Sequence, residues 1–200
     1  MSILKDLHIV VSGDTQAGIL FENIFPNKTF LDISYEKPSQ YIKIYWDEFV
    51  QKGKPNLNGQ FFEILISTLL YREHLLPFYL QAKVAFVPNV NFDILLYSKE
   101  YGPISLSLKT SLRERYKQAD LESIALKYVH RKAKSFLLTM EENEGAKVKE
   151  KILSGDVIGI DGVVICSLQD IDILIEKLHR INFELAGTVS IIQSSHIVQE

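Results

Sequence analysis

The sequence predicts an α/β fold in which a mixed β-sheet is flanked by α-helices. From residue 61 onward, the hydrophobic periodicity follows the order α-β-β-β-α-β-α-β-α. Three short apolar runs come directly after one another, whereas the later runs alternate with amphipathic stretches, and this combination is typical of a mixed sheet with helices on both sides. The chain has 200 residues and shows no internal repeat or long linker, so we expect one domain over residues 1–200.

Helices are expected where apolar residues recur at helical spacing. They lie at residues 16–25, 39–50, 61–70, 111–130, 143–153 and 169–181. The first is expected to end at Pro26. A polar turn over residues 53–59 precedes the third helix, which either Asn56 or Asn58 can cap.

Strands are expected where short apolar runs are bounded by turn residues. They lie at residues 82–87, 92–97, 104–109, 135–140 and 162–167. The second and third form a hairpin around a turn at Gly102-Pro103. Residues 188–198 are expected to form a final strand or an arm.

The composition is that of a soluble globular protein, with 46% hydrophobic and 24% charged residues. No apolar stretch reaches about 18 residues, so we expect no membrane span. The N-terminal residues lack the basic start and apolar core of a signal peptide. A single cysteine, Cys166, excludes an internal disulfide and a zinc site built on several cysteines, and its apolar surroundings predict a buried strand. A reducing, cytoplasmic setting therefore fits best.

Basic residues are concentrated in one part of the chain, although the net charge is −3. The stretch from Lys109 to Lys134 holds eight basic and three acidic residues, a local charge of +5, which leaves −8 for the rest. Such a stripe is the footprint expected of a face that meets phosphates. On charge alone, a solvated helix surface is the better explanation, so the stripe needs support from other residues.

Two charged residues stand out within the predicted hairpin. Because side chains alternate along a strand, Lys109 lies on the same face as Ser105 and Ser107, opposite Leu106. A lysine is costly to bury alone, so this face is expected to be a polar site. Asp93 interrupts the apolar partner strand near its start, and a short hairpin brings that start opposite the end of the third strand. Asp93 and Lys109 are therefore expected to face each other.

Here the chain resembles the P-D…(D/E)-x-K motif of the restriction-endonuclease-like nucleases, through Asp93 followed by a hairpin and Ser107-Leu108-Lys109. The resemblance implies that Asp93 binds Mg²⁺ and that Lys109 helps to activate the attacking water. Phosphodiester hydrolysis needs such a site, because developing negative charge must be neutralised and hydroxide produced near neutral pH. Carboxylate oxygens are hard ligands that suit Mg²⁺.

The sequence departs from the common motif at two positions. Residue 92 is phenylalanine instead of proline, and Ser107 replaces the second metal-binding carboxylate, so Ser107 is expected to be a minor polar group. One branch of type II restriction enzymes, which reads CCGG- and CCNGG-type sites, has S-x-K followed by a glutamate about a dozen residues later. Glu122, 13 residues after Lys109, is similar in type and spacing. Glu114 is the alternative for the same role.

A further glutamate precedes the predicted sheet. Family members often carry N-G-x-x-F-E on the helix before the sheet, and the run Asn58-Gly59-Gln60-Phe61-Phe62-Glu63 is similar to it. The resemblance implies that Glu63 is another metal ligand or a support of one. It covers about residues 56–140, which we expect to be the catalytic core. No phosphate-binding loop, calcium loop or zinc-type histidine spacing is found.

The resemblance implies a type II restriction endonuclease that cleaves double-stranded DNA with Mg²⁺ and forms a homodimer, since two-fold symmetry matches palindromic sites. Arg113, Arg115 and Lys117 follow the catalytic strand and are expected to contact DNA phosphates. Two alternatives remain open. One is a repair or nicking nuclease of the same fold, and the other is an inactive DNA-binding relative, suggested by Ser107. Each candidate residue also has a structural explanation, as a strand-end charge or a solvated helix position.

Overall fold

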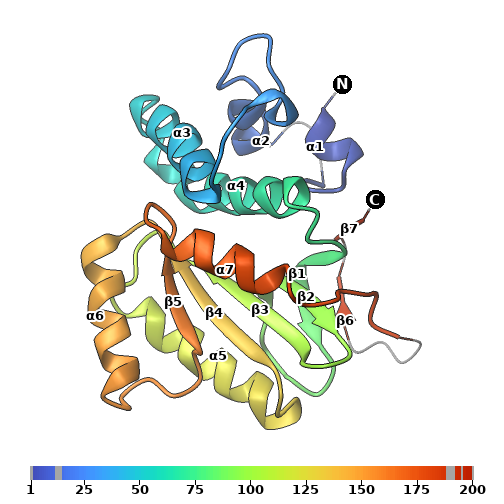
Figure 1. Ribbon diagram of the computed structural model, residues 1–200, viewed down its shortest axis with the longest axis vertical. Helices are drawn as coiled ribbons and strands as arrows, with labels where there is room; N and C mark the ends of the chain where they lie inside the picture. The colour runs from blue at the N-terminus through green and yellow to red at the C-terminus, as the bar shows by residue number, and fades with distance from the viewer. Residues whose placement is uncertain (1, 12–14, 188–191, 195, 200) are drawn as a thin grey trace.

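A mixed β-sheet forms the centre of the protein, which we describe from a computed structural model covering residues 2–11, 15–187, 192–194 and 196–199 (Figure 1). The strand order is β5-β4-β3-β2-β1-β6, and β7 also pairs with β1. The strands are β1 Phe78–Val84, β2 Phe92–Ser98, β3 Gly102–Leu108, β4 Lys134–Thr139, β5 Gly162–Ile165, β6 Ile192–Gln193 and β7 His196–Val198. The helices are α1 Ile3–Asp6, α2 Gln16–Glu22, α3 Pro38–Gln51, α4 Asn58–Arg72, α5 Arg115–Val129, α6 Glu142–Leu153 and α7 Asp170–Leu178. Two short 3₁₀ turns lie at Phe30–Asp32 and Pro55–Leu57.

Strand β3 joins the antiparallel part of the sheet to its parallel part. Strands β1, β2 and β3 are antiparallel, and β2 and β3 form a hairpin in which Ile94 lies opposite Leu106. Strands β3, β4 and β5 are parallel, and each parallel connection contains a helix, α5 or α6. The chain therefore has the predicted mixed sheet, and its elements follow the predicted order from α4 to α7.

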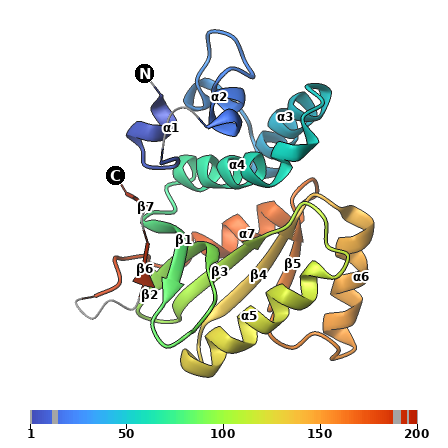
Figure 2. The same ribbon diagram turned by 180° about the vertical axis from the view of Figure 1, so that it is seen from behind.

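Helices cover both faces of the sheet (Figures 1 and 2). The face of Ile94 and Leu106 packs against α4 and α7 in the largest apolar cluster. The opposite face packs against α5, whose Leu126 shares a cluster with Leu95, and against α6. Helices α2 and α3 lie outside α4, where aromatic rings fill the contact; Phe49, for example, stacks on Phe61 with ring centroids 4.0 Å apart. Apolar burial thus fixes where α4 and α5 lie relative to the strands between them.

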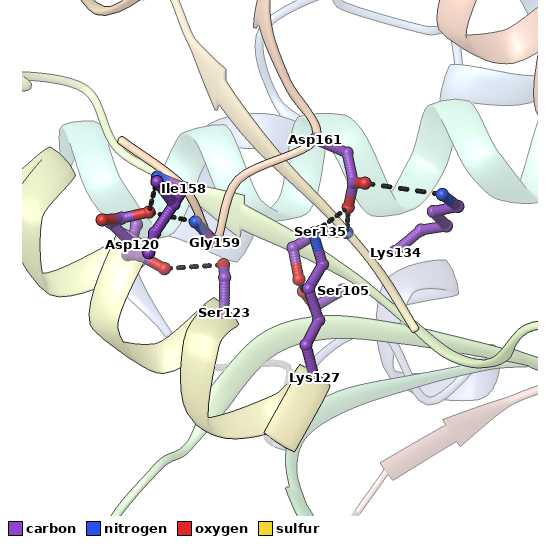
Figure 3. Close-up of polar contacts among 10 residues, drawn as sticks. Ser105, Asp120, Ser123, Lys127, Lys134, Ser135, Ile158, Gly159 and Asp161 are labelled. Atoms are coloured by element: carbon purple, nitrogen blue, oxygen red, sulfur yellow. Dashed lines mark hydrogen bonds and ion pairs between the residues drawn. The ribbon is translucent and has the colours of Figure 1, made fainter. Parts of the chain in front are cut away.

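A loop from residues 156 to 161 holds α5 in place (Figure 3). Asp120 on α5 accepts hydrogen bonds from the backbone N–H groups of Ile158 (3.1 Å) and Gly159 (2.6 Å). A Cβ atom at Gly159 would lie 2.4 Å from the backbone oxygen of Asp120, so only glycine allows this close approach. The loop therefore fixes the position of α5, which packs against the sheet and contacts β4.

Three predicted boundaries are wrong. Strand β1 spans Phe78–Val84 instead of residues 82–87, because Phe78 and Leu80 are buried and pair with β2 as well as β7. Helix α5 begins at Arg115 instead of residue 111. The cap of α4 is Leu57 without a side-chain hydrogen bond, since Pro55–Leu57 forms a 3₁₀ turn that runs directly into the helix, so neither Asn56 nor Asn58 is the cap.

The remaining elements agree with the predictions to within a few residues. The expected turn at Gly102-Pro103 lies slightly earlier, because Gly102 already pairs with Ser98. Cys166 is fully buried directly after β5. Parts of the expected C-terminal strand form β6 and β7, whereas residues 188–191 and 195 lie outside the described residues. In the part of the chain that the structure describes, no helix has the length and apolar character needed to cross a bilayer.

Candidate active site

Asp93 and Lys109 meet at the open end of the β2–β3 hairpin. The Lys109 ammonium lies 2.9 Å from Asp93 Oδ2, and the same oxygen accepts a hydrogen bond of 2.7 Å from the backbone N–H of Leu108. The Lys109 backbone N–H donates to the carbonyl of Leu138, which extends the β3–β4 ladder past the end of β3. Strand pairing therefore fixes the backbone on both sides of the ion pair, and the predicted juxtaposition of these two residues is present.

Ser107 lies two residues before Lys109 and carries a polar group without a hydrogen-bond partner among the described residues. Its Oγ atom is buried and has no hydrogen-bond partner among the described residues. By contrast, Ser105 on the same face donates from its hydroxyl to the Ser135 hydroxyl at 2.9 Å. Buried hydroxyls are ordinarily satisfied by a protein group or an ordered water, so the Ser107 hydroxyl has a hydrogen bond left to make.

Glu63 lies on α4 among buried apolar residues. Burial raises the pKa of the Glu63 carboxyl to about 7, and the charge of Asp93 adds to this rise, whereas a hydrogen bond from Gln81 and the charge of Lys109 act in the opposite direction on its pKa. The Gln81 amide donates to Glu63 Oε1 at 2.7 Å. The charges of Asp93 and Lys109 thus both contribute to the pKa of Glu63, and the role of Glu63 as a metal ligand stays a prediction.

Glu122 lies on α5 at a partly buried position. Its carboxylate accepts a hydrogen bond of 2.7 Å from the Gln118 amide. Burial raises the pKa of Glu122, the Gln118 hydrogen bond and the charge of Lys109 lower the pKa, and the charge of Asp93 raises it. Whether Glu122 serves as the displaced carboxylate therefore stays a prediction.

The alternative carboxylate, Glu114, is directed elsewhere. It lies before the first turn of α5, its side chain is 78% exposed, and it forms an ion pair with Lys117. The predicted helix start at residue 111 would have placed Glu114 in the first turn. Instead, Glu144 of α6 accepts hydrogen bonds from the backbone N–H groups of Leu112 and Arg113, so this segment runs as a loop before α5.

The carboxylates suit a magnesium ion in type, although they are not gathered as a finished cage. Among the described residues, no group of three or more histidine, cysteine, aspartate and glutamate side chains is close enough to hold a metal ion. Asp93 already contacts Lys109, and Glu63 and Glu122 are each bonded to a glutamine amide. The set of Asp93, Glu63 and Glu122 as common metal ligands thus stays a prediction.

The basic stripe is divided by its ion pairs. At the end of α5, Lys127 lies 2.7 Å from Asp161, which also contacts Lys134 at 3.5 Å (Figure 3). At the start of α5, Arg113 and Arg115 are exposed. No carboxylate in the described part of the chain forms an ion pair with either arginine. Exposed arginines outside the ion pairs of the described residues therefore lie at the start of α5, a few residues after Lys109, and Arg131, just beyond the other end of α5, is exposed as well.

Two residues at this site were not predicted from the sequence. Gln81 bonds to Glu63, and the Asn91 amide donates to Gln81 Oε1 at 2.6 Å. The predicted strand began at residue 82 and so left Gln81 outside the sheet. A polar residue among apolar strand residues is the only sequence signal that could have found Gln81.

The comparison with known proteins supports the fold. No family model matches the chain, and no curated protein matches it. A solved structure described as a complex of the restriction endonuclease PspGI with substrate DNA is similar to it, with a TM-score of 0.50, 19% sequence identity and 76% of each chain covered. Together with the mixed sheet flanked by helices, this likeness shows that the chain has a restriction-endonuclease-like fold.

Proposed function

We propose that the protein is a Mg²⁺-dependent type II restriction endonuclease that hydrolyses phosphodiester bonds of double-stranded DNA at a specific sequence. The observation that carries this proposal is the contact between Asp93 and Lys109 at the open end of the β2–β3 hairpin. It occurs in a restriction-endonuclease-like fold, at the two positions that the sequence motif singled out. Glu63 on α4 and Glu122 on α5 are the proposed further ligands, and the charges of Asp93 and Lys109 act on the pKa of each.

The donor set fits magnesium. Asp93, Glu122 and Glu63 offer hard carboxylate oxygens, and the Ser107 hydroxyl, which has no hydrogen-bond partner among the described residues, lies two residues before Lys109. In this proposal the three carboxylates hold the ion, with Glu122 supplying the charge that Ser107 cannot. A bound Mg²⁺ lowers the pKa of a coordinated water and neutralises charge on the phosphate.

Lys109 acts on the reacting groups in this proposal. Its ammonium is fixed by Asp93 and by the backbone of β3, which reduces the side-chain entropy that an ordered lysine would otherwise lose on substrate binding. A positioned ammonium can orient the attacking water and stabilise the negative charge that grows on the phosphate in the transition state. The Leu108 N–H holds the Asp93 carboxylate in place.

DNA binding is proposed from two observations. The similar structure was solved as a complex with substrate DNA, and exposed Arg113 and Arg115 lie just after the proposed catalytic strand. Arginines at this place would hold the backbone phosphates near the scissile bond. A homodimer belongs to the same proposal, since a two-fold protein matches a palindromic site. The single-domain organisation over residues 1–200, the catalytic core at about 56–140 and the cytoplasmic setting remain predictions.

Digestion of a plasmid of known sequence, with and without Mg²⁺, tests the proposal. We expect discrete fragments whose mapped ends share one sequence, and we expect EDTA or the Lys109→Ala substitution to abolish them. Nicks, or cleavage only of branched or damaged DNA, would assign the protein to a repair nuclease instead. Binding without any cleavage would assign it to an inactive DNA-binding relative.

A further inference from the structure

Gln81 interrupts the sheet at the position opposite Asp93. Leu80 pairs with Ile94 and Ala82 pairs with Phe92, so the register places Gln81 opposite Asp93, but no ladder pair joins the two. The backbone at Gln81 has φ = 46°, a left-handed conformation in the middle of β1. Glycine adopts this conformation without steric cost and glutamine does not. Strained non-glycine residues cluster at functional sites, which indicates a use for the Gln81 side chain.

The Gln81 side chain connects two polar groups on different elements. Its amide nitrogen donates to Glu63 Oε1 on α4 at 2.7 Å, and its amide oxygen accepts from the Asn91 amide at 2.6 Å. Because a carboxylate can only accept and the Asn91 nitrogen can only donate, these two bonds fix which end of the Gln81 amide faces Glu63. The left-handed turn at Gln81 sends the side chain out of the regular strand toward α4.

The hydrogen bond between Gln81 and Glu63 joins an exposed side chain to a partly buried carboxylate. Both residues line a mostly apolar cavity of about 160 Å³, whose wall includes Ile9, Val10 and Ile64. Gln81 itself is exposed. The exposed Gln81 amide therefore holds a partly buried carboxylate from the solvent side.

We propose that Gln81, oriented by Asn91, is a positioning residue that holds the Glu63 carboxylate in the geometry needed to bind a divalent cation. The inference rests on the proposed function. Groups that hydrogen-bond to a metal ligand orient it, and their loss ordinarily weakens metal binding without removing the ligand. Gln81 and Asn91 therefore support the cation through Glu63 and do not contact it.

Binding of Mn²⁺ to the DNA-free full-length protein, followed by electron paramagnetic resonance, tests the role directly. The test variant is Gln81→Gly, because glycine accepts the left-handed backbone while the side chain that carries the amide is removed. We expect Gln81→Gly to bind Mn²⁺ about tenfold more weakly than the wild type. The Mg²⁺ concentration for half-maximal DNA cleavage should rise similarly, and saturating Mg²⁺ should restore most of the cleavage rate.

Asn89→Gly is the matched control, since Asn89 is an exposed residue with φ = 62° in the adjacent loop and lines a different cavity. It should keep the wild-type Mn²⁺ affinity. Asn91→Ala should weaken Mn²⁺ binding in the same direction as Gln81→Gly, and the double variant should be no weaker than Gln81→Gly, because Asn91 acts through Gln81.

Wild-type Mn²⁺ affinity in Gln81→Gly, or equal weakening in Asn89→Gly, would overturn the positioning role. If the wild type cleaves DNA while Gln81→Gly behaves like it, only the positioning role fails. If the wild type neither binds Mn²⁺ nor cleaves DNA, the proposed function fails, and the role of Gln81 fails with it.

Discussion

The Lys109 ammonium lies 2.9 Å from Asp93 Oδ2, across the open end of the β2–β3 hairpin. The two side chains are only 14% and 21% exposed, so the pair is mostly shielded from water. Its geometry follows from strand register, because Asp93 precedes Ile94, which lies opposite Leu106, and Lys109 follows the last residue of β3. The pair is thus formed by the sheet itself and does not depend on a mobile loop.

Lys109→Ala should abolish DNA cleavage while DNA binding changes little, because the ammonium is proposed to act on the reacting groups. Loss of Lys109 leaves the mostly buried Asp93 carboxylate without its counter-charge, so the free energy of unfolding should fall by about 1–3 kcal/mol. Plasmid digestion and thermal denaturation measure the two effects. Lys109→Met is the control for side-chain packing. Cleavage within a few-fold of the wild type in either variant would remove Lys109 from the catalytic role.

Glu63→Gln should stabilise the metal-free protein, and more so at high pH. Burial raises the pKa of Glu63 from 4.5 to about 7, so the folded state disfavours the ionised carboxylate. Ionising this buried carboxyl lowers the free energy of unfolding. This loss is absent below the pKa of Glu63 in the unfolded chain, grows as the pH rises toward about 7 and is complete above it. Replacing the carboxylate by an amide should therefore add about 1–3 kcal/mol at about pH 8 and almost nothing near pH 4.

Thermal melting in EDTA at several pH values measures this effect. Glu150→Gln, at an exposed position on α6, is the matched control and should leave the melting temperature unchanged across the range. A Glu63→Gln variant that melts at the wild-type temperature at about pH 8 would contradict the burial of an ionisable carboxyl at this site. If Glu63 is also a metal ligand, the same variant should lose most of its Mg²⁺-dependent cleavage.

Arg113→Ala and Arg115→Ala should each weaken DNA binding similarly on all sequences. Both arginines are exposed, and a lost phosphate contact should flatten the dependence of log affinity on log salt concentration by about one unit. Lys117→Ala should have a smaller effect, because Lys117 already pairs with Glu114. Arg131→Ala, just beyond the other end of α5, is the control. A changed sequence preference with an unchanged salt slope would mean that the arginine reads bases instead.

The sequence predicted those parts of the fold and site that depend on periodicity and strand register. The Asp93–Lys109 contact follows from alternation along two strands joined by a short hairpin, and both strands lie where expected. The predicted bounds of β1 were wrong because its first residues directly follow Pro77. Phe78 and Leu80 also pair with a distant C-terminal strand, and such pairing leaves no local sequence pattern.

The rest of the site depends on contacts between distant segments. Gln81 has a left-handed backbone conformation, and its side chain bonds to Glu63 on another element. The close approach of Gly159 to α5 likewise joins segments far apart in the chain. Local propensity carries no information about such contacts. The start of α5 was misplaced for the same reason, since Glu144 binds the backbone of Leu112 and Arg113 from another helix.

Glu122→Gln should remove Mg²⁺-dependent cleavage, whereas Glu114→Gln should leave it nearly intact. Glu122 is partly buried on α5, within reach of the charges of Asp93 and Lys109, whereas Glu114 is 78% exposed and paired with Lys117. Loss of a charged ligand should lower the cleavage rate by at least about a hundredfold at limiting Mg²⁺. Rates measured over a range of Mg²⁺ concentrations, with DNA binding measured in parallel, separate a lost ligand from a misfolded protein.

Substitutions at Ser107 complete this test of the displaced carboxylate. Ser107→Ala should cost much less than Glu122→Gln, because a hydroxyl supplies no charge to a metal ion. The double variant Ser107→Glu with Glu122→Ala should recover part of the cleavage lost in Glu122→Ala, since it restores a carboxylate at the usual motif position. Normal cleavage by Glu122→Gln, together with loss of cleavage in Glu114→Gln, would transfer the second carboxylate to Glu114. Normal cleavage by both variants would leave Asp93 and Glu63 as the proposed ligands, and the displaced-carboxylate arrangement would be wrong.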